Sequence, residues 1–356
     1  MDRTLAIYPT AHKVEDVLRR AGANGCEWDY RVLTFPQLIR RLWRECRDGR
    51  AAIEACSERL IVEEALRAAP DTGLAPVAGL VDHVHGLIRQ FKSAALQPAD
   101  LTQALAALRN QSRLGAVVTI FAAYQAILER SRLADAHDRE YAVLRMLHEA
   151  ERADTRPALL DGVTRLMVAE IYDFSILQFM IVTSLTRIIG DARVLIQAST
   201  RGVDATRFAE LTWNRFVAEE SIADQVLPDF VRRDGRPGTL GFVLEHLFAE
   251  RLEAPPARDS TLAITQAPSR LGEVEYVARA IRHELEAPDG IAPARIAVLA
   301  RDLAPYADHL RAVFRRYRIP LTMFHSGPLM ATPPARLLAD LVRTPLDGYR
   351  RVALAA

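Results

Sequence analysis

A lysine near the start of this chain, Lys13, stands where a nucleotide phosphate could be bound. It follows an apolar segment from Thr4 to Tyr8, which is typical of a buried strand. A phosphate-binding loop in such a place uses glycines that let the phosphate approach, a lysine, and a Ser or Thr that binds Mg²⁺. Here the glycine positions hold Tyr8, Thr10 and His12. Because Val14 fills the Ser/Thr position and cannot bind a metal, Lys13 is either a ligand in a non-standard loop or a surface lysine at the start of a helix.

Alternating strands and helices would position Lys13 at the edge of a parallel sheet. The predicted strands are Thr4–Tyr8, Arg31–Phe35, Val163–Ala169 and Arg193–Gln197. The predicted helices are Lys13–Arg20, Gln37–Glu45 and Ser175–Ile188. Such alternation favours parallel strands joined by right-handed crossovers. From about Ala51 to Ala153 helical periodicity replaces it, which predicts a large all-helical insertion within the α/β domain.

The segment from Leu262 to Leu329 predicts a second α/β domain, because strands and helices alternate again. The predicted strands are Leu262–Thr265, Arg295–Ala300 and a short one around Ile319–Leu321. A polar, turn-rich segment, Glu253–Asp259, precedes them and is typical of a domain boundary. The predicted domains are therefore 1–259, with the insertion at about 51–153, and 260–356.

Two features of the sequence resemble a known family. The first is the order strand, helix, strand, Arg301, helix, strand, with Glu273 at the start of the first of these helices. The second is the run Tyr172-Asp-Phe-Ser-x-x-Gln178 after an apolar strand. Together they resemble UvrD-like DNA helicases, and within that group the AddB-type subunit of bacterial helicase–nuclease complexes. The similarity is specific from Leu262 to Leu341 and around Glu170 to Gln178, and loose across the helical segment.

The resemblance implies a RecA-like helicase domain with a helical insertion, followed by the start of a second α/β motor-like domain. It also implies a heterodimer with an AddA-type motor subunit, and contact with single-stranded DNA during double-strand break repair and recombination. AddB-type subunits are hydrolases that continue into a PD-(D/E)XK exonuclease domain with an iron–sulfur cluster. This sequence has neither the nuclease motif nor the cysteines of the cluster. We therefore expect a fragment, a truncated reading frame or a degenerate paralogue.

The same resemblance assigns candidate catalytic residues. Helicases of this group end a strand with Asp-Glu-x-x-Asp, in which the first Asp holds Mg²⁺ and the Glu polarises the attacking water. Glu170 and Asp173 match this motif, whereas Ala169 replaces the metal-binding Asp. The alternative interpretation is structural, since Asp173 or Ser175 could cap the next helix.

Arg301 and Thr34 are candidates for phosphate contacts. Arg301 matches the arginine that reaches the γ-phosphate between the two motor domains of these helicases, and the alternative is an ion pair with Asp302 or Glu275. Thr34 matches a position that contacts the backbone of single-stranded DNA. The alternative for Thr34 is the N-cap of the helix that follows. Lys13 and Arg301 are thus the nucleotide candidates, and Thr34 is the DNA candidate.

The composition is that of a globular protein, with 50% hydrophobic and 26% charged residues. There is no apolar run of about 18 residues and no secretory signal, so we expect no membrane contact and a cytoplasmic protein. Cys26, Cys46 and Cys56 lack the spacing of metal ligands, which predicts reduced thiols and no metal site. A net charge of +1 gives no global nucleic-acid signature. Two of the 46 basic residues are lysine, at Lys13 and Lys92, and the others are arginine.

The sequence leaves three functions open. The first is an inactivated helicase-like region of an AddB-type subunit that binds single-stranded DNA without ATPase or nuclease activity of its own. The second is a residual DNA-dependent ATPase or helicase that uses a non-standard loop at Lys13. The third is a non-catalytic scaffold for protein interaction. Only the second requires a cofactor in this chain, which would be ATP with Mg²⁺.

Overall fold

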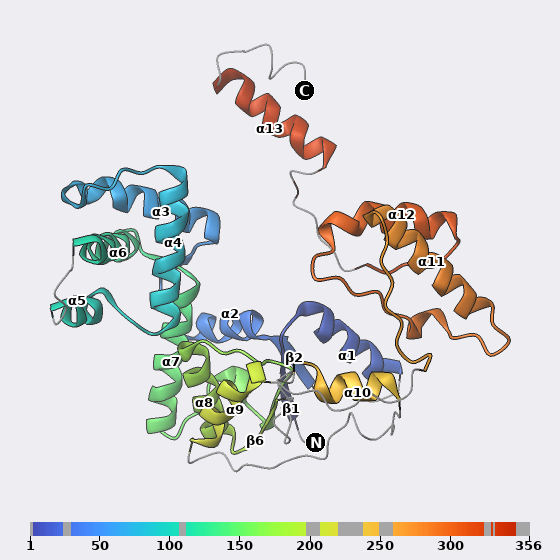
Figure 1. Cartoon of the computed structure of the whole chain (residues 1–356). Helices are drawn as coiled ribbons and strands as arrows, with labels where there is room; N and C mark the ends of the chain where they lie inside the picture. The colour runs from blue at the N-terminus through green and yellow to red at the C-terminus, as the bar shows by residue number, and fades with distance from the viewer. Residues whose placement is uncertain are drawn as a thin grey trace. The chain divides into compact units, whose positions relative to one another are not determined.

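The computed structural model describes residues 3–23, 30–106, 112–196, 207–219, 238–248, 259–323, 329 and 332–346. The chain divides into two compact units, residues 1–258 and 259–356, and each is described by itself. It has an α/β fold that is mostly helical and includes a small parallel sheet of four strands (Figure 1).

The sheet of the first unit contains the four strands predicted there. They are β1 (Arg3–Tyr8), β2 (Tyr30–Thr34), β5 (Val163–Ala169) and β6 (Asp191–Leu195). All are parallel, in the order β2-β1-β5-β6. The chain leaves β1 on one side to form β2 and returns on the other side to form β5. The strand order therefore reverses between β1 and β5, which is the topological switch point of a doubly wound sheet.

Both faces of the sheet are covered, so its strands are apolar on both sides. One face packs against α2 (Phe35–Glu45), α7 (Ala136–Arg152) and α8 (Ile176–Ile189). That core contains the strand residues Leu5, Ile7, Leu33, Leu166 and Val168. The opposite face packs against α1 (Ala11–Ala23) through a small cluster of Ala6, Tyr8, Val14, Val32 and Ala169. Because side chains alternate along a strand, neighbouring residues such as Val168 and Ala169 enter different cores.

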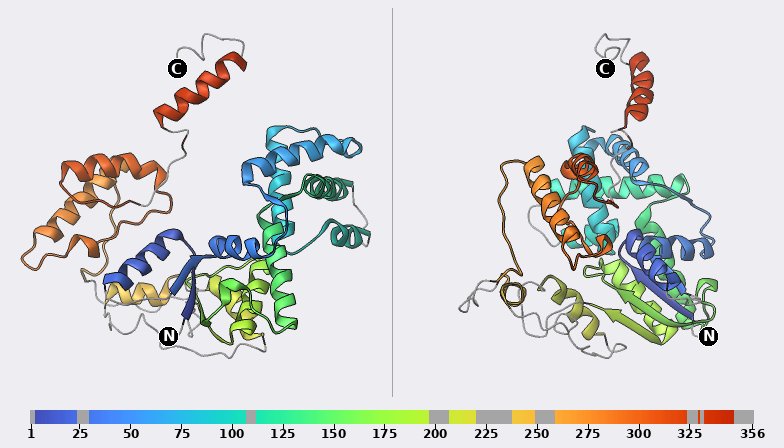
Figure 2. Two further views of the ribbon diagram at one scale, coloured as in Figure 1. Left: turned by 180° about the vertical axis from the view of Figure 1, so that it is seen from behind. Right: turned by 90° about the vertical axis from the view of Figure 1, so that its right-hand side faces the viewer.

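Helices dominate the segment between β2 and β5. They are α3 (Ala55–Ala68), α4 (Ala78–Ser93), α5 (Pro98–Ala106), α6 (Ser112–Arg130) and α7, with the 3-10 turn Pro70–Thr72. Two short strands, β3 (Ala51–Ala52) and β4 (Leu133–Ala134), pair in parallel where the segment begins and where α7 starts. The predicted all-helical character of residues 51–153 is therefore wrong at these two strands, which bring the start of the segment beside the start of α7. A separate core from Ile53 to Leu128 holds α3, α4 and α6 together. Figures 1 and 2 show these helices beside the sheet, with α7 running along α8.

After β6 the first unit adds α9 (Arg207–Val217) and α10 (Thr239–His246). The second unit contains α11 (Arg270–Glu286), α12 (Ala307–Arg316) and α13 (Pro333–Leu346), with 3-10 turns at Pro293–Arg295 and Ala304–Tyr306. Its core joins α11 to α12. The residues of that core are Val274, Ala278, Ile281, Leu310, Val313, Phe314 and Ile319.

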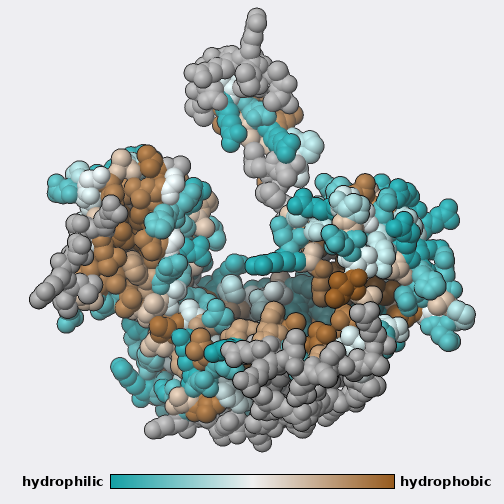
Figure 3. Space-filling model, in the orientation of Figure 1, coloured by the Kyte–Doolittle hydropathy of each residue, from teal (hydrophilic) through white to brown (hydrophobic). Residues whose placement is uncertain are grey.

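The strands predicted in the second unit are wrong for the residues that the structure describes. Segments 262–265, 296–300 and 319–321 are irregular and pair with no other strand there. Ile264 and Leu299 are more than 90% exposed. Figure 3 shows a mostly hydrophilic surface over α11 and α12. An apolar run favours a strand, but a strand forms only when a neighbour satisfies its backbone N–H and C=O groups.

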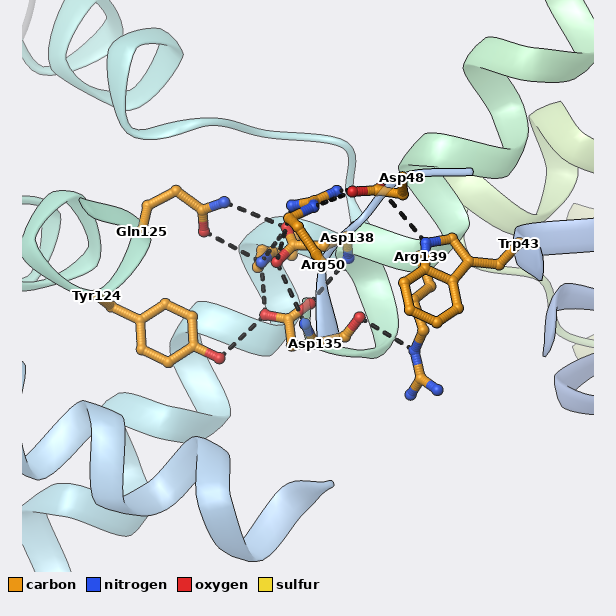
Figure 4. Close-up of polar contacts among 9 residues, drawn as sticks. Trp43, Asp48, Arg50, Tyr124, Gln125, Asp135, Asp138 and Arg139 are labelled. Carbon is orange, nitrogen blue, oxygen red and sulfur yellow. Dashed lines mark hydrogen bonds and ion pairs between the residues drawn. The ribbon is translucent and has the colours of Figure 1, made fainter. Parts of the chain in front are cut away.

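A buried ion-pair network connects the helical segment to the helices on the sheet. Lys92, at the end of α4, is fully buried, and its ammonium group lies 2.5 Å from Asp135 Oδ2 and 2.6 Å from Asp138 Oδ1. Its third hydrogen bond goes to Gln125 Oε1 of α6, at 3.1 Å. The Tyr124 hydroxyl donates to Asp135 Oδ2 at 3.0 Å (Figure 4). All three donors of Lys92 are therefore used, as a buried charge requires.

Asp135 and Asp138 also fix the start of α7. Asp135 is its N-cap, accepting from the Asp138 backbone N–H, while the Asp138 carboxylate accepts from the Asp135 N–H. Burial alone would favour the neutral form of Asp135, but the Lys92 ammonium outweighs it and holds the pKa of this carboxyl below its usual value. The sequence analysis missed this network. Two signals were present: Lys92 continues the apolar spacing of Val81, Val84 and Ile88, and the two aspartates have capping-box spacing.

We expect Lys92→Met to destabilise the first unit by about 3–5 kcal/mol, since it removes the ammonium group shared by two buried carboxylates and, among the described residues, leaves Asp138 only its 3.9 Å ion pair with Arg50. Urea unfolding followed by circular dichroism measures the loss. The matched control is Arg59→Met, which breaks the exposed 2.7 Å ion pair between Arg59 and Asp82 across α3 and α4. It should cost less than about 1 kcal/mol. Equal losses for the two variants would contradict a central role for Lys92.

Candidate functional site

The carboxyl ends of β1 and β5 form the candidate site. In a doubly wound sheet, ligands bind in the crevice beside the carboxyl ends of the strands at the switch point. Here the residues that follow β1, β2 and β5 meet at that edge, because all three strands are parallel and adjacent. Tyr8 is paired in register with Thr34, and Ile7 with Val168.

The edge brings together two of the candidate residues, Lys13 and Glu170. The Lys13 ammonium lies 2.7 Å from Glu170 Oε1, and their side chains are 34% and 45% exposed. Lys13 is in the first turn of α1, where its backbone N–H donates to Thr10 Oγ1 at 3.2 Å. Glu170 has φ of 61°, a left-handed conformation that non-glycine residues seldom adopt, and its N–H donates to Leu195 O. The ion pair therefore spans the switch point, from the turn after β1 to the residue after β5.

The positions that would hold Mg²⁺ lie in an apolar cluster beneath this ion pair. Val14 and Ala169 are buried together with Tyr8, at 7%, 5% and 8% exposure. Magnesium requires a near-octahedral set of oxygen ligands, and neither the Val14 nor the Ala169 side chain carries an oxygen. The residues present therefore do not fit a nucleotide with its metal ion.

Thr34 and Ser175 are helix caps. Thr34 is 7% exposed, and its hydroxyl accepts from the Gln37 backbone N–H at 3.3 Å, while its own N–H donates to Gln37 Oε1. Ser175 makes the same capping box with Gln178 at the start of α8. Of the two capping alternatives for that helix, the structure selects Ser175. Asp173 is exposed and makes no hydrogen bond or ion pair within the described part of the chain.

Helix α9 forms hydrogen bonds with the loop between β5 and α8, which carries Glu170 and Asp173. The Thr212 hydroxyl donates to Tyr172 O at 2.7 Å, and Arg215 donates to Phe174 O at 3.3 Å. The rings of Tyr172 and Phe208 meet edge to face, with centroids 5.5 Å apart. Burial raises the pKa of Tyr172, the Glu170 carboxylate adds to this, and Lys13 opposes it. Tyr172 therefore lies within electrostatic reach of the ion pair at the switch point.

Arg301 belongs to the second unit, where it is exposed and forms no ion pair with a described residue. Neither alternative partner is engaged with it. Asp302 accepts from the Ala304 backbone N–H at 2.9 Å, and Glu275 pairs with Arg316. Glu273, the acidic residue of the family pattern, accepts from the Tyr306 hydroxyl at 3.0 Å.

Within the described ranges, no cluster of three or more His, Cys, Asp or Glu side chains could hold a metal ion. Cys46 and Cys56 are free thiols, and Cys26 lies outside the described residues. No helix of the described ranges combines the length and apolar character needed to cross a membrane. No protein-family model matches the sequence, and a search of curated proteins finds no match.

Glu140 of α7 is a further titratable group, beside Gln178 of α8, and the sequence analysis did not single it out. Its Oε1 accepts a long 3.5 Å hydrogen bond from Gln178 Nε2, and its buried Oε2 has no partner among the described residues. Burial raises the pKa of Glu140 to about 7, against an opposing contribution from Gln178 and a further raising contribution from Asp135. The ionised form is therefore disfavoured where α7 meets α8.

The stability of this junction should depend on pH. The folded pKa of Glu140 lies above its unfolded value, so ionisation costs folding energy progressively as pH rises from about 4.5 to 7. We expect Glu140→Gln to be more stable than the wild type at pH 8 and equally stable near pH 4, below both pKa values. Denaturation at both values measures this. Glu149→Gln, an exposed change on the same helix, should have no effect at either pH, and a similar gain in both variants would refute the assignment.

Proposed function

We propose that this chain is the helicase-like region of an AddB-type helicase–nuclease subunit, and that it binds single-stranded DNA in double-strand break repair and recombination. The observation that supports this most is the edge of the parallel sheet. It places Lys13 beside Glu170 at the switch point, followed by the Tyr172–Gln178 run as a loop and a capped helix. In this proposal the first unit is a RecA-like domain, α3 to α7 are its helical insertion, and the second unit begins the second motor-like domain.

The apolar cluster at Val14 and Ala169 argues against ATP hydrolysis by this chain. In the proposal, Glu170 and Asp173 are not catalytic, and Arg301 has no nucleotide to contact. The chain acts in the cytoplasm as a body that guides DNA, while an AddA-type motor subunit in the same heterodimer hydrolyses ATP. Such a role needs a positioned surface for phosphates and bases, and it needs no cofactor in this chain.

The DNA role is tested by fluorescence anisotropy with a labelled single-stranded oligonucleotide. We expect saturable binding that weakens as salt rises, because bound counterions are released from the phosphates. An acidic polymer of equal charge is the reference competitor. Affinity for DNA that is no better than affinity for this polymer, at low and moderate salt, would end the proposal.

Two matched variants test whether Thr34 contacts the DNA. Thr34→Ala and Ser175→Ala each remove one capping box of the same type, and each should cost about 1 kcal/mol of stability. If Thr34 also binds a backbone phosphate, as the proposal expects, only Thr34→Ala lowers DNA affinity, by several-fold. Equal affinity in the two variants would limit Thr34 to capping.

ATP hydrolysis should be at background in the presence of DNA. Wild type, Lys13→Ala and Glu170→Gln should give the same rate, because the buried Val14 and Ala169 leave no ligands for the metal ion. A DNA-stimulated rate in the wild type that both substitutions abolish would instead establish the residual ATPase.

A further inference from the structure

The Lys13–Glu170 ion pair occupies the part of the fold where a bound anion would be expected. Strand β1 ends at Tyr8 and α1 begins at Ala11, so the first turn of the helix faces the switch point. Backbone N–H groups at such a helix start, together with a basic side chain, favour negative charge. In this chain the negative charge beside Lys13 comes from its own residue Glu170, 2.7 Å away.

The choice of lysine at this position is unusual for this protein. Two of the 46 basic residues are lysine, and both ammonium groups contact carboxylates. Lys92 does so with no exposure, at 2.5 Å from Asp135. An ammonium group is a compact point charge, whereas a guanidinium group is a wide planar fork. In both lysines the single Nζ atom of the ammonium group contacts a carboxylate oxygen.

The chain neighbours of the ion pair are buried. Val14 and Ala169, next to Lys13 and Glu170, pack with Tyr8 in one apolar cluster. Among the described residues, the Glu170 carboxylate is the one anion that the geometry brings to Lys13.

We infer that the Glu170 carboxylate is the resident anion of the switch point. It neutralises Lys13 from within the chain and takes the place that a ligand phosphate would need. This contact keeps Lys13 from binding an added phosphate group, and the Val14 and Ala169 side chains beside it carry no oxygen for the metal ion of a nucleotide. The further consequence rests on the proposed function: the affinity of this chain for single-stranded DNA does not respond to nucleotide.

Pyrophosphate is the probe for the resident anion. An exposed ion pair contributes little to folding, so Glu170→Ala should remain folded and leave Lys13 without its counter-ion. We expect 10 mM pyrophosphate to raise the melting temperature of Glu170→Ala by a few degrees relative to wild type, because a ligand that binds only the folded state stabilises it. The double variant Lys13→Ala/Glu170→Ala should show no such gain.

The matched control is Asp173→Ala, which removes an exposed acidic group from the same loop. It should behave like the wild type, and this separates the specific effect of Glu170 from a general loss of negative charge. The inference is overturned if pyrophosphate stabilises the wild type as much as Glu170→Ala, if Asp173→Ala gains equally, or if Glu170→Ala gains nothing.

The consequence for DNA is tested separately. Anisotropy titrations with and without a non-hydrolysable ATP analogue and Mg²⁺ should give dissociation constants within twofold of each other. A change of fivefold or more would overturn the inference. A wild type that binds no single-stranded DNA would overturn the proposed function alone, and the pyrophosphate experiment would then decide the role of Glu170.

Discussion

The buried ammonium group of Lys92 is the contact on which the arrangement of the first unit depends. It joins the end of α4, the middle of α6 and the first turn of α7, with each of its three donors engaged. Because α7 packs against α2 and α8, which cover one face of the sheet, the same contact fixes the helical segment against the α/β part. A buried charge is tolerated only as part of a complete set of partners, so these elements depend on one another.

The edge of the sheet shows how alternation along a strand can remove a binding site. Tyr8 and Ala169 point to the face covered by α1, where they pack with Val14 in an apolar cluster. The charged residues Lys13 and Glu170 lie just beyond the strand ends and neutralise each other. A parallel sheet with a switch point is thus present, while the positions compared with a phosphate-binding loop hold packed apolar side chains and an internal ion pair. This contrast is why the proposed role is DNA contact without catalysis.

Much of the first unit could be predicted from the sequence, because its signals are local. Apolar runs bounded by turns predicted β1, β2, β5 and β6, and a helix cap was one of the two alternatives for Thr34. The second unit could be predicted only in its helices. Amphipathic periodicity suffices for α11 and α12, whereas the apolar segments around Ile264 and Leu299 needed neighbouring strands that the described residues do not supply.

The sequence by itself determined the parallel α/β pattern, the mainly helical segment, the absence of glycines at Tyr8, Thr10 and His12, and the absence of a hydroxyl at Val14. It could not determine which charges meet. Lys13 and Glu170 are far apart in the chain, as are Lys92 and Asp135, and each pair is brought together only by packing. The choice between Asp173 and Ser175 as the helix cap was likewise decided by backbone geometry. Ion pairs and caps depend on distances of a few ångströms between atoms, and those distances follow from the tertiary structure, in which the strand order β2-β1-β5-β6 sets the neighbours.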